Sequence, residues 1–152
     1  MKLAEALNQR SALIKQISEL KNRLVDCVCV QEGDTPVDTA EELMQELDPL
    51  IEQLHQLVYQ INLTNLQTKD NSKSITELLA ERDALSMRIN YLNDCLNHLR
   101  DNRVRYRSDD IRFIRTIDPK ILRDMQSKES AKLRQINLKI QMLGWTHDLI
   151  EA

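Results

Sequence analysis

The chain has 152 residues and a formal net charge of −3, and it contains only two Gly and five aromatic residues. Its 23 Leu and 13 Ile supply most of the apolar bulk, which favours a helical core over a β-sandwich. The scarcity of Gly argues against phosphate-cradling loops and dinucleotide-binding turns, because both need backbone with positive φ. We therefore expect a mainly α fold in a single domain over residues 1–152, an antiparallel four-helix bundle or coiled coil with a small β element at one end.

The first expected helix covers residues 2–25. The positions expected to face the core are separated by four and three residues in turn, which is typical of one buried helix face. These positions are Leu3, Leu7, Arg10, Ile14, Ile17, Lys21 and Leu24, with Leu13 and Leu20 widening the stripe. Two of the seven are charged, so the predicted face is imperfect.

The second expected helix covers residues 38–66. Asp38 and Glu41 have the spacing of a capping box at its start. Pro49 lies inside this range, but the apolar stripe keeps its register across the proline, which predicts a kink rather than a break. The stripe consists of Leu43, Leu47, Leu50, Leu54, Leu57 and Ile61.

The third and fourth expected helices cover residues 74–100 and 119–144. Ser74 and Glu77 predict a capping box, and Asp118 followed by Pro119 predicts the start of the last helix. Gly144 suits its C-terminal cap. The polar residues 69–73 form a short loop, so the second and third helices should fold back on each other. The positions expected to face the core are Leu78, Arg82, Leu85, Ile89, Leu92, Leu96 and Leu99 in the third helix. In the fourth helix they are Leu133, Ile136, Ile140 and Leu143.

The two long connections, residues 26–37 and 101–118, should share one end of an antiparallel bundle. Both contain alternating apolar and polar residues, which predicts a small antiparallel sheet there, with ordered loops as the alternative. The apolar members of this pattern are Val28, Val30, Val104, Tyr106, Ile111 and Phe113. We expect Phe113 to be buried.

The second connection also carries a cluster of arginines. They can bind phosphate groups while Tyr106 and Phe113 stack on bases, which predicts a nucleic-acid or nucleotide site. The alternative is a solvated charged face, because the overall pI is near 5.6. The cluster comprises Arg100, Arg103, Arg105, Arg107, Arg112 and Arg115, and the first connection adds Gln31, Glu32 and Asp34 as candidate ligand- or partner-binding residues.

Metal-dependent and catalytic functions have little support. Cys27, Cys29, Cys95 and His98 have the ligand types of a zinc site, but the Cys-x-Cys spacing is short for zinc, so we expect free buried thiols. No paired nucleophile and base stands out, and we expect no catalytic residue, no metal, no cofactor and no enzymatic activity. The odd number of Cys, the absence of a cleavable leader and the lack of a bilayer-spanning apolar run predict a cytoplasmic protein with no membrane partner.

Several motifs resemble, in order, a family of small bacterial coiled-coil proteins, some of which carry the label septicolysin. They include Leu20-Lys21-x-Arg23-Leu24, Val30-Gln31-Glu32-Gly33-Asp34-x-Pro36, Ile61-Asn62-x-Thr64-Asn65, Arg82-Asp83-x-Leu85, Ile111-Arg112-Phe113-x-x-Thr116-Ile117-Asp118 and Trp145-Thr146. The resemblance covers the chain end to end and implies a cytoplasmic coiled-coil fold. Cys27, Cys29 and Pro49 depart from the family pattern.

Taken together, the sequence predicts a non-enzymatic, self-assembling helical protein that acts as an interaction module. Helices of about 40 Å present more apolar surface than one slim bundle covers, which predicts a homo-oligomer. The alternative is binding of nucleic acid or another anionic ligand through the arginine-rich residues 100–115. A membrane-active, cytolysin-like protein is a third and weaker hypothesis, because no helix face is strongly apolar.

Overall fold

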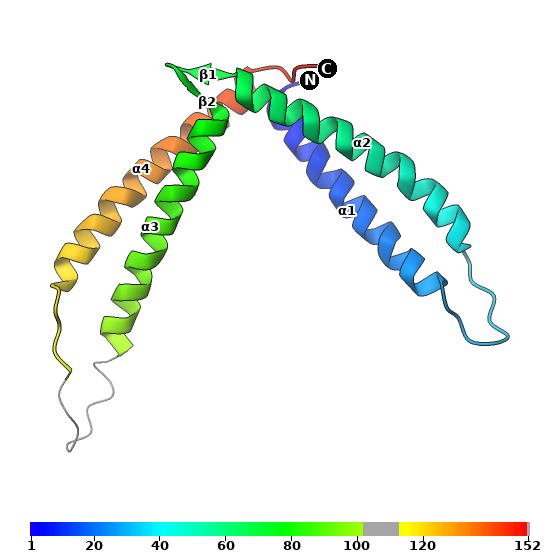
Figure 1. Cartoon of the computed structure of the whole chain (residues 1–152), viewed down its shortest axis with the longest axis horizontal. Coiled ribbons are helices and arrows are strands. Elements are labelled where there is room, and N and C mark those ends of the chain that lie inside the picture. Colours follow the sequence, from blue (N-terminus) through cyan, green and yellow to red (C-terminus); the bar gives the residue numbers. More distant parts are fainter. Residues whose placement is uncertain (102–112, 152) are drawn as a thin grey trace. The chain divides into compact units, whose positions relative to one another are not determined.

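A computed structural model describes residues 1–101 and 113–151. The fold is mainly α with a small antiparallel sheet, as the sequence predicts (Figure 1). The helix bounds lie within two residues of the expected ranges. The elements are α1 (Leu3–Cys27), α2 (Ala40–Gln67), β1 (Lys69–Asp70), β2 (Lys73–Ser74), α3 (Ile75–Asp101) and α4 (Pro119–Thr146).

The chain divides into two compact units. Unit 1 consists of residues 1–70 and 143–152, and unit 2 consists of residues 71–142. Each unit is built on an antiparallel pair of helices, α1 with α2 in unit 1 and α3 with α4 in unit 2 (Figure 1). The expectation that residues 1–152 fold as one domain stays a prediction.

In unit 1, α1 packs on α2 with a face that overlaps the expected one only in part, since Leu3 is buried and Ile17 and Leu24 pack against the core. The buried positions of α1 are Leu3, Ala6, Leu13 and Leu20. Of the predicted stripe, Leu3 is buried and Leu7 is half-buried, but Ile14 is 50% exposed and Lys21 is exposed. The face that packs therefore includes Leu13 and Leu20, which the spacing predicts only as the edge of the stripe.

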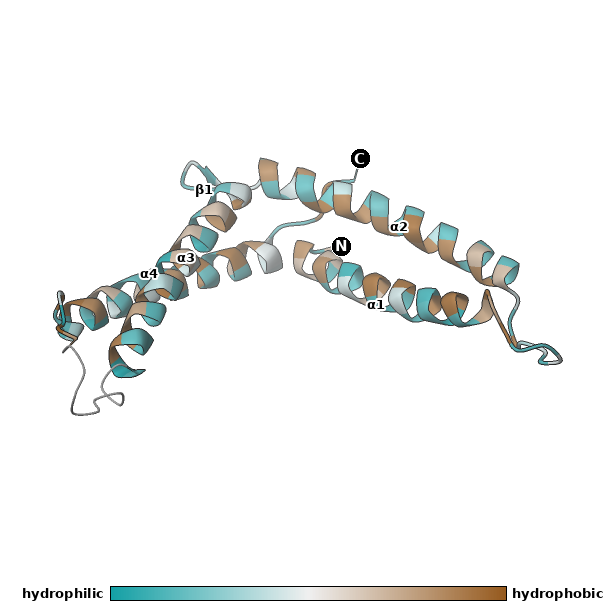
Figure 2. Ribbon diagram, turned by 60° about the horizontal axis from the view of Figure 1, so that its bottom comes forward, coloured by the Kyte–Doolittle hydropathy of each residue, from teal (hydrophilic) through white to brown (hydrophobic). Residues whose placement is uncertain are grey.

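The predicted stripe of α2 is confirmed. Leu43, Leu47, Leu57 and Ile61 are buried, and the helix continues through Pro49 without a break. Leu43 and Leu47 form a cluster with Leu20 of α1. The capping box lies one residue later than expected, because Thr39 accepts a hydrogen bond from the Glu42 backbone N–H at 3.2 Å. Figure 2 shows hydrophobic and hydrophilic residues alternating along these helices.

The end of α4 and the residues after it belong to unit 1. Gly144 does not cap α4 as expected but lies within its last turn, where an added Cβ would approach the Ala4 Cβ at 3.8 Å. The backbone N–H of Ile150 donates to the buried Thr64 Oγ1 at 2.9 Å. This hydrogen bond fixes the segment after α4 against α2.

In unit 2, α3 and α4 bury some of the expected positions and leave the others half-buried. Leu78, Leu85 and Leu92 of α3 are buried, as is Ile136 of α4, and the predicted Ser74–Glu77 capping box forms. Polar side chains also connect the two helices. Gln126 of α4 donates to Asn93 Oδ1 of α3, and the Glu129 carboxylate of α4 lies 3.8 Å from the Arg88 guanidinium of α3. These cross-helix pairs fix the antiparallel register.

The sheet is not where the sequence predicts it. β1 and β2 form a hairpin in residues 69–74, in the loop that was expected to be a plain turn. Asn71 and Ser72 both have positive φ, 46° and 90°, as in a type I′ turn. The β element of the fold is therefore a two-residue-turn hairpin between α2 and α3.

The predicted strands of the first connection are wrong. Cys27 is the last residue of α1, and Val28 and Val30 are 66% and 45% exposed in irregular backbone. In the second connection, Val104, Tyr106 and Ile111 lie outside the described residues. Residues 113–118 contain no strand, and Phe113 is 73% exposed rather than buried.

Candidate functional site

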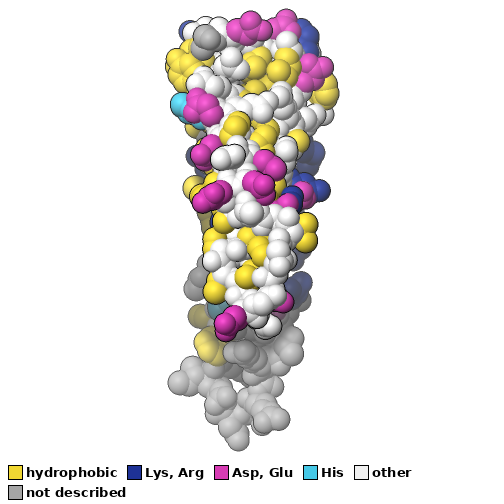
Figure 3. Space-filling view, turned by 90° about the vertical axis from the view of Figure 1, so that its right-hand side faces the viewer, with side chains coloured by type: hydrophobic (Ala, Val, Ile, Leu, Met, Phe, Trp, Pro, Cys, Tyr) yellow, Lys and Arg dark blue, Asp and Glu magenta, His cyan; other side chains and the backbone are white. Residues whose placement is uncertain are grey.

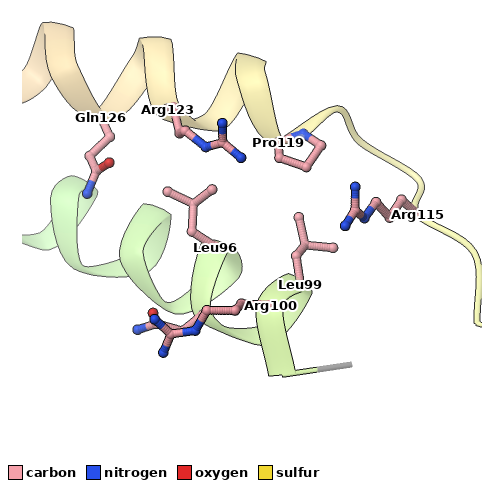
Figure 4. Close-up of a pocket in the computed structure, with 8 residues that line it drawn as sticks. Leu96, Leu99, Arg100, Arg115, Pro119, Arg123 and Gln126 are labelled. Atoms are coloured by element: carbon pink, nitrogen blue, oxygen red, sulfur yellow. The ribbon is translucent and has the colours of Figure 1, made fainter. Parts of the chain in front are cut away.

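A pocket of about 390 Å³ lies in unit 2 between the end of α3 and the beginning of α4 (Figure 4). Antiparallel packing creates it, because the last turns of α3 meet the first turns of α4. Leu96 and Leu99 are half-buried and form its apolar part. Its lining residues are Leu96, Asn97, Leu99, Arg100, Arg115, Pro119, Arg123 and Gln126.

Three arginines surround this pocket. Figure 4 shows the side chains of Arg115 and Arg123 approaching from opposite sides of Pro119, whereas Arg100 lies on the other side of Leu96 and Leu99. Arg115 precedes α4 and Arg123 lies in its second turn. The pocket therefore combines an apolar part with guanidinium groups that come from three separate stretches of chain.

The pocket is electropositive. Within residues 1–101 and 113–151, Arg115 and Arg123 have no ion-pair partner, and Arg100 lies 3.8 Å from the adjacent Asp101. The Asp118 carboxylate lies next to Pro119 in the sequence, and its Oδ1 accepts the Lys120 backbone N–H at 2.9 Å. The positive end of the α4 dipole lies at the same place. Such a pocket favours an anion over a cation or a neutral ligand.

Only part of the predicted arginine cluster can be placed. Arg115 lines the pocket, and Arg100, at the edge of the cluster, lines it too. Four more predicted site residues lie outside the described residues; they are Arg103, Arg105, Arg107 and Arg112. The predicted site thus stays a prediction for most of its members.

The predicted residues of the first connection lie in unit 1. Gln31, Glu32 and Asp34 are all exposed. The Asp34 backbone N–H donates to the Gln31 carbonyl at 3.0 Å, and Gly33 has a φ of 93°. Gly33 therefore supplies the positive φ that this turn requires.

Arg123 and Gln126 are pocket residues that the sequence analysis missed. The predicted arginine cluster ends at Arg115, before the start of α4 at Pro119. A signal was available, since residues 119–126 must lie beside the end of α3 once the two helices run antiparallel. A predicted site that includes the first two turns of α4 would contain Arg123.

A second feature is a shallow apolar groove of about 460 Å³ on α2 in unit 1. Ile51 and Tyr59 are 49% and 53% exposed. All of its lining residues fall on one helix face, at Ile51, Leu54, His55, Val58, Tyr59 and Asn62. We call this feature the α2 groove.

The cysteines do not form the expected buried set. Cys27 is half-buried, whereas Cys29 and Cys95 are exposed, and all three are free thiols. In the part of the chain that the structure describes, no group of three or more His, Cys, Asp or Glu side chains is arranged to hold a metal. Over the same residues, no helix is both long and apolar enough to cross a bilayer.

Residues 10–149 match a family of unknown function (DUF6847). The chain belongs to this family. A crystal structure of a functionally unknown conserved protein from Corynebacterium diphtheriae is similar over 99% of this chain and 99% of that chain, with 33% sequence identity and a TM-score of 0.92. A comparison with curated proteins finds no match. Neither the family nor the crystal structure is described as a septicolysin. The comparisons therefore support membership of a family of unknown function and give no support to that label.

Proposed function

We propose that the protein is a non-enzymatic helical interaction module whose partner is a second copy of the same chain. The observation that carries this proposal is the opposite charge of the two units. Unit 1 has six Lys and Arg against fourteen Asp and Glu, a net charge of −8, and unit 2 has fifteen against ten, a net charge of +5. Opposite charges favour an arrangement in which unit 1 of each copy meets unit 2 of the other.

The exposed surface supports association. The chain of 17.8 kDa has an accessible surface of 11608 Å². Two separate compact proteins of half that mass would together expose only about 9600 Å². The excess of about 2000 Å² is more than the roughly 800 Å² that each partner buries in a standard interface. Helical pairs therefore leave enough uncovered surface for a stable dimer.

The α2 groove supplies an apolar centre for the interface. Figure 3 shows hydrophobic side chains interspersed with Asp and Glu on one face of the molecule. Unit 2 has exposed apolar side chains to match, since Met87 and Tyr91 of α3 are 71% and 50% exposed and Leu138 of α4 is 65% exposed. An apolar centre with charged surroundings is the usual anatomy of a specific interface.

Sedimentation or light scattering over a dilution series tests the association. We expect a dimer or larger mass at about 100 µM that dissociates on dilution, and dissociation at higher protein concentration when NaCl is raised to about 1 M, because salt screens the opposite charges. A monomer mass at every concentration would refute self-association. A mass that does not respond to salt would refute the charge-based pairing.

A double variant tests the surface. Ile51→Ser with Tyr59→Ser removes the two most exposed apolar side chains of the α2 groove, and we expect the dimer dissociation constant to rise at least about tenfold. Leu66→Ser is the matched control, since Leu66 is 60% exposed on α2 outside the groove. Circular dichroism checks that both variants stay helical. Equal dissociation constants for the parent and the double variant would exclude the groove from the interface.

A further inference from the structure

We propose that the pocket between α3 and α4 binds a small molecule that carries a phosphate monoester and an apolar group. The phosphate would lie between Arg115 and Arg123, and the apolar group would contact Leu96 and Leu99. This site is separate from the α2 groove, so the inference goes beyond self-association.

The charge of the pocket determines the anionic part. Guanidinium groups bind phosphate through paired N–H donors, which matches the planar geometry of Arg. Arg115 and Arg123 approach from opposite sides of Pro119 and have no ion-pair partner among residues 1–101 and 113–151 (Figure 4). Both side chains are exposed, and a dianionic monoester attracts two guanidinium groups more strongly than a monoanion does.

The apolar part follows from the remaining lining. Leu96, Leu99 and Pro119 are half-buried, so they leave apolar surface open to an occupant. Asn97 and Gln126 add amide groups that can hydrogen-bond to hydroxyl or phosphate oxygens. A volume of about 390 Å³ accommodates a small organic molecule.

A small ligand fits this pocket better than a nucleic-acid strand does. Proteins that bind single strands use aromatic side chains on which successive bases stack. Among the described residues that line the pocket, none is aromatic. The phosphates of a nucleic-acid strand are also diesters with one negative charge each, and each would attract the two guanidinium groups less strongly than a dianion does.

Phenyl phosphate is the probe, added to the full-length protein and followed by amide and methyl NMR shifts. We expect saturable shifts at Leu96, Leu99 and Arg123, with weaker binding of inorganic phosphate, which lacks the ring. Because the second proton of a phosphate monoester is lost near pH 6, affinity should rise between about pH 5 and pH 8. The absence of shifts at these residues up to about 10 mM phenyl phosphate would refute the proposal.

Charge-removing variants locate the ligand. We expect Arg115→Gln and Arg123→Gln each to weaken phenyl phosphate binding at least about tenfold. Arg134→Gln is the matched control, because Arg134 is exposed on α4 and does not line the pocket. An equal loss with Arg134→Gln would mean nonspecific attraction to a basic surface.

A short single-stranded DNA titration separates the two ligand classes. The proposal expects it to bind no better than inorganic phosphate at these residues. DNA binding that depends on Arg115 and Arg123, with no response to phenyl phosphate, would overturn the proposal in favour of a nucleic-acid surface.

Discussion

The backbone N–H of Leu149 donates a hydrogen bond of 2.8 Å to the carbonyl oxygen of Met1. Beside it, the Leu3 N–H donates to the His147 carbonyl at 3.0 Å, which satisfies one of the N–H groups that the first turn of α1 leaves without an intrahelical partner. The Lys2 ammonium reaches the Asp148 carboxylate at 3.0 Å. Residues 1–3 and 147–149 thus form a short bridge that joins the start of α1 to the segment after α4.

Asp148→Asn tests this bridge through pH. The hydrogen bond from Lys2 holds the pKa of Asp148 below its ordinary value. A carboxyl group with a lowered pKa stabilises the fold above its unfolded pKa, about 3.9, and this contribution is lost as the pH falls through the folded pKa. We expect the variant to melt at a lower temperature than the parent at pH 7 and at the same temperature near pH 2. Asp124→Asn, at an exposed position of α4, should match the parent throughout.

Thr64→Val tests the anchor between α2 and the end of the chain. Thr64 is fully buried, and its Oγ1 donates to the Gln60 carbonyl at 2.7 Å while it accepts the Ile150 N–H. Valine keeps the shape but leaves the Ile150 N–H without this acceptor, so we expect a loss of about 1–3 kcal/mol and faster amide exchange at Ile150. Thr76→Val, at an exposed position, serves as the control. Unchanged exchange at Ile150 would show that the hydrogen bond does not hold this segment.

Leu43→Ala tests the packing of α1 on α2. Leu43 is 1% exposed and contacts the cluster that includes Leu20 and Leu47. Its truncation should lower the free energy of unfolding by about 2–5 kcal/mol, measured by urea denaturation. The same change at Leu66, which is 60% exposed on the same helix, should cost less than about 0.5 kcal/mol. Similar losses at both positions would contradict the described packing.

Ser74→Ala tests the start of α3. The Glu77 N–H donates to Ser74 Oγ at 3.2 Å, and the Ser74 N–H donates to Glu77 Oε2 at 2.6 Å. Removing the hydroxyl should cost about 1 kcal/mol and increase amide exchange in the first turn of α3. Ser127→Ala, at an exposed position of α4, should have almost no effect. If Ser74→Ala also had none, the capping box would not contribute to stability.

The helices could be predicted because apolar spacing and caps agree for most of the chain. In α2 the Leu positions permit only one register, and the predicted stripe is buried. In α1, Leu7 and Ile14 offer one stripe while Leu13 and Leu20 offer another. The small Ala6, fully buried, belongs to the second. Packing against α2 decides between the two, and this information lies outside α1.

The connections could not be predicted from alternation alone. Residues 69–74 have no apolar alternation and no Gly in the turn, yet Asn71 and Ser72 adopt positive φ and pair β1 with β2. Val28 and Val30 alternate with polar residues but pair with no strand among residues 1–101 and 113–151, and they are exposed. In the candidate site, Arg115 was predicted because it lies in a local cluster. Arg123 was not, because only tertiary pairing brings it to the pocket.

The discontinuous makeup of unit 1 has a consequence for folding during synthesis. Unit 2 is one continuous stretch of 72 residues. Unit 1 includes residues 143–152, so α1 and α2 emerge early but acquire the acceptor at His147 and the Ile150 donor only at a late stage. Contacts of such long sequence separation form slowly. Unit 1 therefore closes only after the last residues of the chain have been synthesised.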